Sequence, residues 1–193
     1  MTGLALEVQH PLAYGGNDTE DMEVLTEWMR LYGTDVLNVA YSYVRHYHQA
    51  QDLTQETFLR AFRKMHTFRN DSSVRTWLLS IAVNCCKDYL RSWQYRKVHP
   101  EEELEGACAD SGAGSTPEHL VIHELENQEL WQVVEELPEK YREVLVLFYL
   151  RELSGQEIAE VLGTSEQNVR TRLYRARGLL REALEGKGWN HES

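Results

Sequence analysis

A stretch in the middle of the chain separates two segments that have the pattern of amphipathic helices. From residue 98 to residue 137 there are eleven Asp or Glu and no Lys or Arg, and the part between Arg96 and Glu118 is rich in Gly, Ser and Pro without an amphipathic repeat. Helical periodicity recurs on both sides, from residue 24 to residue 185, whereas strand patterns are nearly absent. The sequence therefore predicts an all-α protein: two small helical domains joined by a flexible acidic linker.

The same pattern predicts the domain boundaries. We expect a disordered tail over residues 1–21, a first domain over 22–97, a linker over 98–116, a second domain over 117–186 and a C-terminal tail over 187–193. A hydrophobic content of 42% is enough for a core in each domain. No apolar run approaches the roughly 20 residues that span a bilayer, and the start does not have the pattern of a signal peptide. We expect a cytoplasmic protein without direct membrane insertion.

The charge distribution indicates nucleic-acid binding despite a formal net charge of −11. The central acidic stretch accounts for the whole imbalance, because the rest of the chain sums to zero. Residues 60–97 carry nine Lys or Arg against two acids, and residues 170–181 carry five Arg and no acid. Since Lys and Arg neutralise DNA phosphates, two basic blocks predict two separate contacts with nucleic acid.

The strongest local signal is a helix-turn-helix near the C-terminus. Ser154 and Glu157 have the spacing of a capping box, which starts a short helix. Gly163 can take the left-handed conformation that ends it, and Thr164 or Ser165 can cap the next helix. That second helix has apolar residues at alternating four- and three-residue intervals: Val169, Leu173, Ala176, Leu180 and Ala183.

The polar side of this second helix suits a DNA major groove. Arg can donate two hydrogen bonds to guanine, and Gln or Asn can pair with adenine, each good pair discriminating by ~1–3 kcal/mol. The alternative interpretation is an Arg-rich helix face that only contacts solvent. The outward-facing residues are Gln167, Asn168, Arg170, Thr171, Tyr174 and Arg175.

Three helices are expected in the first domain. The first covers about residues 24–47 and breaks near Gly33, and the second covers about residues 50–65. Ser72 or Ser73 can cap the third. The spacing of Trp77 with apolar neighbours favours packing in the core over base stacking.

Long segments resemble the extracytoplasmic-function (ECF) branch of the sigma-70 family. The family's region 2.2 helix is similar to QDLTQETFLRAFRKMHTF, and its regions 2.3 and 2.4 are similar to FRNDSSVRTWLLSIAVNCCKDYLRS. Region 4 is similar to LPEKYREVLVLFYLRELSGQEIAEVLGTSEQNVRTRLYRARGLLREAL. The resemblance covers about residues 24–96 and 124–186. It implies a sigma factor, which is not an enzyme, that binds bacterial core RNA polymerase and directs promoter-specific transcription initiation.

The resemblance also implies partners and roles. It implies contacts with the polymerase β′ coiled coil and β flap, with double- and single-stranded promoter DNA, and with an anti-sigma factor that could hold the chain at the membrane. The residues that it implies for docking on the β′ coiled coil are Asp52, Gln55, Glu56 and Arg60. Recognition and melting of the minus-10 element fall on Phe68, Asn70, Asp71, Ser72, Ser73, Asn84, Lys87 and Arg91. Recognition of the minus-35 element falls on Gln167, Asn168, Arg170, Thr171, Tyr174 and Arg175, with Arg172 and Arg177 on backbone phosphates.

No cofactor or metal site is expected. Cys85, Cys86 and Cys108 include no CxxC pair and are interpreted as free thiols. His46 and His48 point apart on a helix. Two alternatives from other classes stay open: a DNA-processing enzyme, which would need a strand-containing catalytic core, and a helix-turn-helix regulator that is not a polymerase subunit, which would need a sensor domain.

Overall fold

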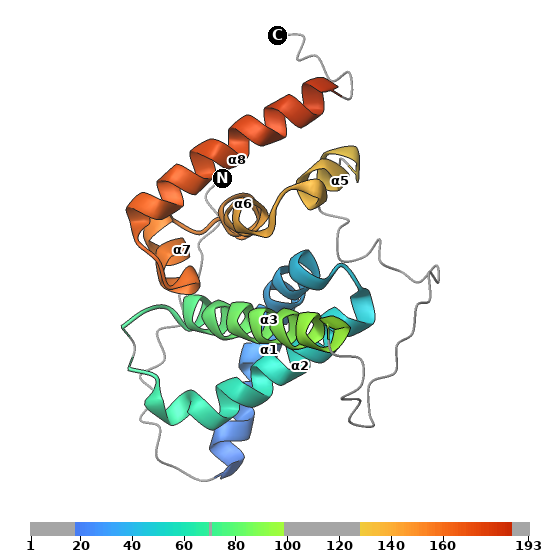
Figure 1. Ribbon diagram of the computed structural model, residues 1–193. Helices are drawn as coiled ribbons and strands as arrows, with labels where there is room; N and C mark the ends of the chain where they lie inside the picture. The colour runs from blue at the N-terminus through green and yellow to red at the C-terminus, as the bar shows by residue number, and fades with distance from the viewer. Residues whose placement is uncertain (1–17, 70, 99–127, 187–193) are drawn as a thin grey trace.

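The protein is built from helices throughout the described residues. The structure, a computed structural model, describes residues 18–69, 71–98 and 128–186, and no strand occurs in these ranges. The N-terminal domain contains α1 (Asp18–Val44), α2 (Tyr47–Lys64), the short turn η1 (Met65–Thr67) and α3 (Val74–Val98). The C-terminal domain contains α5 (Gln128–Glu136), α6 (Glu139–Leu145), the π-helical turn η2 (Val146–Leu150), α7 (Gly155–Leu162) and α8 (Glu166–Gly186) (Figure 1). The all-α prediction is confirmed, and no described helix is long and apolar enough to cross a membrane.

The N-terminal domain is a three-helix packing unit. Helix α1 packs against both α2 and α3, and these two also pack against each other. At one end of the unit, Trp77 contacts the ring of Trp28 edge-on, with centroids 5.7 Å apart, and lies 4.9 Å from the ring of Phe68. Trp77 is half-buried in this aromatic cluster, as expected for a packing role.

Three expectations for the N-terminal domain need correction. The first helix does not break near Gly33: α1 runs through it unbroken and already begins at Asp18, so residues 18–21, which we expected in a tail, belong to the helix. A glycine inside a helix costs about 1 kcal/mol relative to alanine, and the burial of Trp28 and Val36 on either side outweighs it. Helix α2 begins at Tyr47 rather than near residue 50, because His46 accepts a hydrogen bond from the backbone of Gln49.

The third helix starts as predicted. The hydroxyl of Ser73 accepts a 3.0 Å hydrogen bond from the backbone N–H of Thr76, which satisfies one of the free donors at the start of α3. The helix buries more of its circumference than its sequence pattern suggested. Leu78 and Ile81 are buried on the side of α3 that the sequence pattern predicted. Leu79 and Val83 are fully buried on another side of the same helix.

The helix-turn-helix is confirmed in detail. The backbone N–H of Ser154 donates to the Glu157 carboxylate at 2.8 Å, and the backbone N–H of Glu157 donates to the Ser154 hydroxyl at 3.3 Å. Gly163 ends α7 with φ 62°, in the left-handed region. Ser165 accepts from the backbone of Asn168 at the start of α8. Val169 is fully buried, so α8 is fixed against the domain core.

Arg142 stabilises the end of α5 from the neighbouring helix. One of its guanidinium nitrogens donates to the backbone carbonyls of Glu135 and Leu137, at 3.0 and 3.1 Å. These carbonyls have no further turn of α5 to bond to. Burial lowers the pKa of Arg142. The contact orients α5 and α6 relative to each other.

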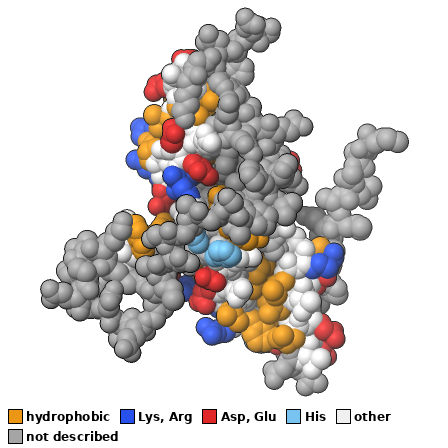
Figure 2. Space-filling view, turned by 90° about the vertical axis from the view of Figure 1, so that its right-hand side faces the viewer, with side chains coloured by type: hydrophobic (Ala, Val, Ile, Leu, Met, Phe, Trp, Pro, Cys, Tyr) orange, Lys and Arg blue, Asp and Glu red, His pale blue; other side chains and the backbone are white. Residues whose placement is uncertain are grey.

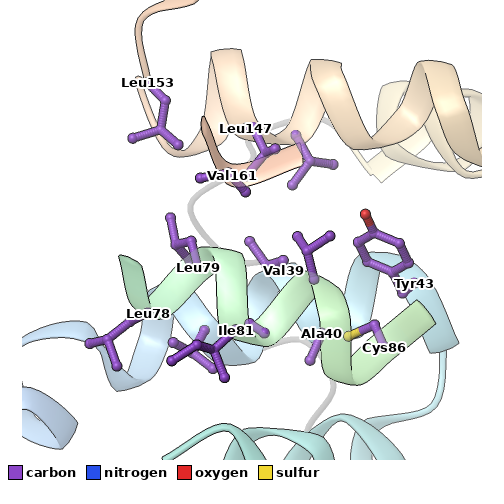
Figure 3. Packing of buried hydrophobic residues seen from close by; sticks show 14 of the residues in the cluster. Val39, Ala40, Tyr43, Leu78, Leu79, Ile81, Cys86, Leu147, Leu153 and Val161 are labelled. Atoms are coloured by element: carbon purple, nitrogen blue, oxygen red, sulfur yellow. The ribbon is translucent and has the colours of Figure 1, made fainter. Parts of the chain in front are cut away.

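The two domains pack on each other directly. Helix α3 packs on α7, while α1 contacts α6 and η2. Figure 3 shows Leu79 and Val39 from the first domain facing Leu147, Leu153 and Val161 from the second, all of them buried. The linker predicted for residues 98–116 lies outside the described residues except for Val98, the last residue of α3. Residues 117–127 and the tail over 187–193 also lie outside them.

Candidate nucleic-acid interface

Helix α8 presents most of the predicted minus-35 residues to solvent. Gln167, Asn168, Arg170 and Thr171 are exposed near its start, and Arg175 and Arg177 are exposed one to two turns later. Tyr174 is 81% exposed, an unusual position for an aromatic ring unless it contacts a partner. Arg172 differs from the rest because it is half-buried. The exposed side of α8 is therefore the side that the sequence predicted.

Each Arg on this part of α8 is held by a partner. Arg170 pairs with Glu166 at 2.6 Å within the helix, and Arg172 donates to Glu143 at 2.8 Å. The exposed Arg170–Glu166 pair is a weak interaction that DNA phosphates or bases can displace. The Arg172–Glu143 pair involves a buried carboxylate and is the more persistent of the two.

Two further Arg side chains of this helix, Arg175 and Arg177, lie beside tyrosines. Arg177 donates to the hydroxyl of Tyr149 at 2.9 Å and lies over the Phe148 ring, 5.4 Å from its centroid. The Arg175 guanidinium lies beside the hydroxyl of Tyr141 and lowers its pKa. A tyrosine orients a guanidinium without neutralising its charge, so Arg175 and Arg177 stay available to DNA.

The predicted minus-10 residues lie along α3 and the turn before it. Asn84 and Arg91 are exposed on α3, and Lys87 is half-buried. In the turn, Asp71 and Ser73 are exposed and Ser72 is half-buried. Asn70 lies outside the described residues.

Phe68 differs from the other predicted minus-10 residues because its side chain is only 9% exposed. It packs against Trp77, at a centroid distance of 4.9 Å. Its side chain therefore supports the turn from inside in this structure.

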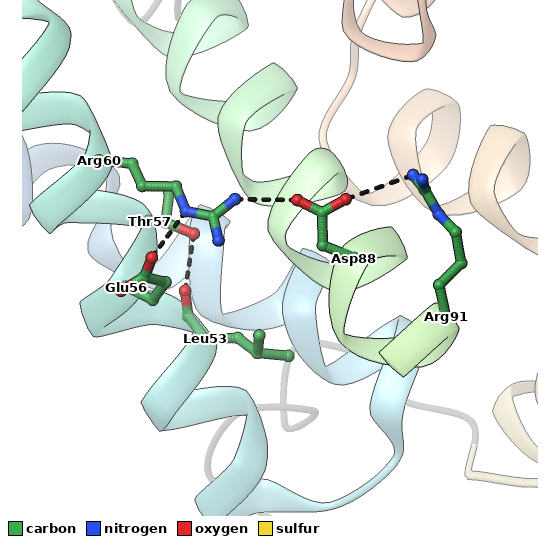
Figure 4. Close-up of polar contacts among 6 residues, drawn as sticks. All are labelled: Leu53, Glu56, Thr57, Arg60, Asp88 and Arg91. Atoms are coloured by element: carbon green, nitrogen blue, oxygen red, sulfur yellow. Dashed lines mark hydrogen bonds and ion pairs between the residues drawn. The ribbon is translucent and has the colours of Figure 1, made fainter. Parts of the chain in front are cut away.

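The predicted polymerase-docking residues share one side of α2. Asp52 and Gln55 are exposed there, together with Leu59, which is 50% exposed. Glu56 and Arg60 are half-buried, and Arg60 connects α2 to α3 (Figure 4). Mixed polar and apolar side chains on one helix side suit a specific, reversible protein contact.

Several hydrophobic side chains of the N-terminal half are exposed. On the face drawn in Figure 2, they gather over the half formed by α1, α2 and α3. Met22, Met29 and Leu31 on α1 are 40–51% exposed. This half therefore offers apolar area as well as the polar docking side of α2.

Sequence reasoning missed three charged residues at the contact between the domains. Glu143, Arg151 and Asp35 are largely buried and bond across it. Nothing in the spacing of these residues distinguishes them from solvent-facing charges. The only signal was the apolar run from Val144 to Leu150, of which Val144 to Leu147 are buried while Tyr149 is exposed.

The described residues offer no metal centre. No group of three His, Cys, Asp or Glu in these ranges could hold a metal ion. Cys85 and Cys86 are buried free thiols, and burial raises the pKa of Cys86 to about 12. Cys108 lies outside the described residues. His46 caps α2, and its ring centroid lies 6.0 Å from that of His48.

The fold and its exposed basic helix define a two-domain, helix-turn-helix DNA-binding protein. Comparison with protein families makes this class specific: residues 28–96 match the model of sigma-70 region 2, and residues 127–180 match that of sigma-70 region 4. The chain belongs to the sigma-70 family of RNA polymerase sigma factors, in its ECF branch.

Individual relatives agree with this assignment. The chain is 34% identical over 168 residues to the ECF RNA polymerase sigma factor SigM of Bacillus subtilis, which covers 87% of this chain and 99% of the relative. It is 36% identical over 141 residues to the ECF RNA polymerase sigma-E factor of Escherichia coli K12, a match that covers 70% of this chain and 72% of the relative. Its fold resembles that of the sigma factor RpoE from Bartonella quintana, solved in complex with the anti-sigma factor NepR. The two structures match with a TM-score of 0.65 and 22% sequence identity, over 84% of this chain and 98% of the Bartonella chain.

Proposed function

We propose that this chain binds core RNA polymerase through α2 and carries it to promoters that are read at two places. Helix α8 reads the minus-35 element as duplex, and α3 with the turn before it recognises and melts the minus-10 element. In this proposal the first domain, residues 22–97 extended back to Asp18 by α1, docks on core polymerase and melts the minus-10 element. The second domain, residues 117–186, reads the minus-35 element. The observation that carries the proposal is that one chain combines the capped, solvent-facing recognition helix α8 with Lys87 and Arg91 on one side of α3.

The chain is a specificity factor in this proposal, so bond formation belongs to the polymerase. Melting needs a base to be unstacked and held, which costs a few kcal/mol and calls for a basic track beside the displaced strand. Asn84 and the turn over residues 68–73 supply the pocket, and Lys87 and Arg91 hold phosphates. No step requires a cofactor. Work in the cytoplasm follows from this role, because the polymerase and its template are there.

An anti-sigma factor is the proposed regulator. The Bartonella sigma factor of similar fold was solved with such a partner. In this chain, a regulator would compete most directly by covering α2, where Asp52, Gln55 and Leu59 are exposed. Binding of a regulator there would block polymerase docking.

Run-off transcription tests the proposal. Core polymerase from the source organism is combined with the purified chain on a library of genomic fragments, and transcripts are mapped. We expect transcripts that start downstream of a shared pair of sequence elements, only when the chain is present. A chain that shifts duplex promoter DNA alone and adds no transcripts would instead be a conventional helix-turn-helix regulator.

A further inference from the structure

The carboxylate of Glu143 lies at the contact between the two domains and binds groups from both. Its side chain is 4% exposed. Oε2 accepts from the Tyr43 hydroxyl at 2.6 Å and from the Lys87 ammonium at 3.1 Å, and Oε1 accepts from Arg172 at 2.8 Å. Tyr43 and Lys87 belong to α1 and α3 of the first domain, whereas Arg172 belongs to α8. A single carboxylate of α6 thus ties both domains together.

Both cations at Glu143 have a proposed role in binding DNA phosphates. Lys87 is assigned to the minus-10 element and Arg172 to the minus-35 element. The two elements are named for positions about 25 base pairs apart, which is roughly 85 Å of straight duplex at 3.4 Å per base pair. Lys87 and Arg172 both lie within 3.1 Å of one carboxylate. The arrangement in this structure therefore cannot occupy both promoter elements at once.

A second polar contact supports the same closed arrangement. Asp35 on α1 accepts from Arg75 of its own domain at 2.6 Å and pairs with Arg151 of the C-terminal domain. On α1, Val39 lies one helical turn from both Asp35 and Tyr43, and it is one of the buried apolar residues shown in Figure 3. The closed form is thus held by an apolar centre with an ion-pair cluster at each of two places.

The polar part of this contact is imperfectly matched. Arg151, which pairs with Asp35 across the contact, has a buried Nε without a hydrogen-bond partner among the described residues. A buried polar atom without a partner loses its hydration without compensation, which weakens an interface. Separation of the domains would rehydrate Arg151 Nε and the Glu143 cluster, so this contact is suited to opening.

We propose that Glu143 is an intramolecular latch that takes the place of DNA phosphates in the free chain. It holds the domains closed and neutralises Lys87 until the domains separate, while its pair with Arg172, inside the C-terminal domain, keeps the carboxylate in place. This inference rests on the proposed DNA-binding roles of those two cations. It makes the free chain a poor DNA binder for a structural reason: two of its phosphate-binding cations already have a buried anionic partner.

The test compares Glu143→Gln with a matched control, Glu166→Gln. Both substitutions remove one carboxylate that pairs with an Arg of α8, but Glu166 pairs within its own helix and is exposed. Small-angle X-ray scattering of the full-length chain measures the radius of gyration, and fluorescence anisotropy measures affinity for a short random-sequence DNA duplex. Circular dichroism checks that each variant is folded. Tyr43→Phe, which removes one hydrogen bond to Glu143, is the milder second variant.

We expect Glu143→Gln to enlarge the radius of gyration and to tighten duplex binding by about fivefold or more, the range of typical conformational couplings. Tyr43→Phe should shift both readouts in the same direction by less, and Glu166→Gln should leave the radius unchanged. Unchanged radii in Glu143→Gln and Tyr43→Phe would overturn the latch, as would an equal affinity gain in Glu166→Gln. The scattering result does not depend on the proposed function, which is tested separately by transcription with core polymerase.

Discussion

Arg60 of α2 donates a 3.0 Å hydrogen bond to Asp88 of α3 and thereby joins the proposed polymerase-docking helix to the proposed minus-10 helix. Arg60 also donates to Glu56 at 2.6 Å, and Asp88 pairs with Arg91 at 3.3 Å (Figure 4). The two carboxylates raise the pKa of Arg60, which is charged in any case. The side chains of Arg60 and Asp88 are 34% and 50% exposed, so solvent screens the attraction between them.

The Asp88→Asn substitution should therefore have a small effect on stability. Exposed ion pairs contribute at most about 1 kcal/mol, and we expect the free energy of unfolding to fall by less than that amount in urea titrations. Leu78→Ala provides the comparison, because Leu78 is fully buried and such truncations cost about 2–5 kcal/mol. Similar losses in the two variants would mean that the Arg60–Asp88 pair carries far more energy than its exposure allows.

Two glycine substitutions in the C-terminal domain should have opposite signs. Gly163 has φ 62°, where a side chain costs roughly 1–2 kcal/mol, so Gly163→Ala should lower the melting temperature. Gly178 lies exposed inside α8 with open space where a Cβ would be, and Gly178→Ala should stabilise by about 1 kcal/mol. Thermal unfolding followed by circular dichroism measures both. A stabilising Gly163→Ala would contradict the left-handed turn.

Stability should decrease in alkaline solution because of Cys86. Burial raises the pKa of this thiol from 9.0 to about 12. Above pH 9 the unfolded chain releases the thiol proton while the folded chain keeps it, so the stabilisation is complete below pH 9 and is lost as the pH rises towards 12. The slope for one such group is at most about 1.4 kcal/mol per pH unit.

Urea unfolding at pH 8 and pH 10 under reducing conditions measures this loss. Cys86→Ala should show a smaller drop between the two pH values than the parent chain. Burial also raises the pKa of Cys85 and Tyr43, so a residual drop remains in the variant. Identical drops in the two proteins would place the alkaline sensitivity elsewhere.

Arg175→Ala should impair minus-35 recognition and leave core polymerase binding intact. Loss of a base-reading Arg costs about 1–3 kcal/mol and relaxes specificity at one position. Arg181→Ala is the matched control, since Arg181 is an exposed Arg further along the same helix. Promoter binding by the reconstituted holoenzyme measures the loss, and pull-down of core polymerase checks docking. Equal losses in promoter binding and docking would show that the division of labour is wrong.

The helix-turn-helix could be predicted from sequence because its signals are local. Ser154, Glu157 and Gly163 act on backbone groups within a few residues, so spacing alone determines their geometry. The position of Val169 on the buried side of α8 followed from periodicity in the same way. In contrast, the expected break at Gly33 failed because distant packing partners, absent from the local pattern, stabilise α1 through that residue.

The contact between the domains could not be predicted. Leu79 and Val83 lie on a side of α3 that a helix in a single domain would expose, and only the second domain explains their burial. Glu143 and Lys87 are 56 positions apart in sequence, on either side of the residues that the structure does not describe. Pairing over such a distance leaves no periodic signal, so a polar residue in this contact has the same sequence signature as one in solvent.

Association with core RNA polymerase tests the central claim most directly. Purified chain is mixed with bacterial core enzyme at low salt, and size-exclusion chromatography follows the complex, with a double substitution of Asp52 and Gln55 to Ala on the exposed side of α2 as the comparison. A complex with the parent chain that is weakened in this variant is the predicted result. Absence of any complex between the parent chain and core polymerase would contradict the account.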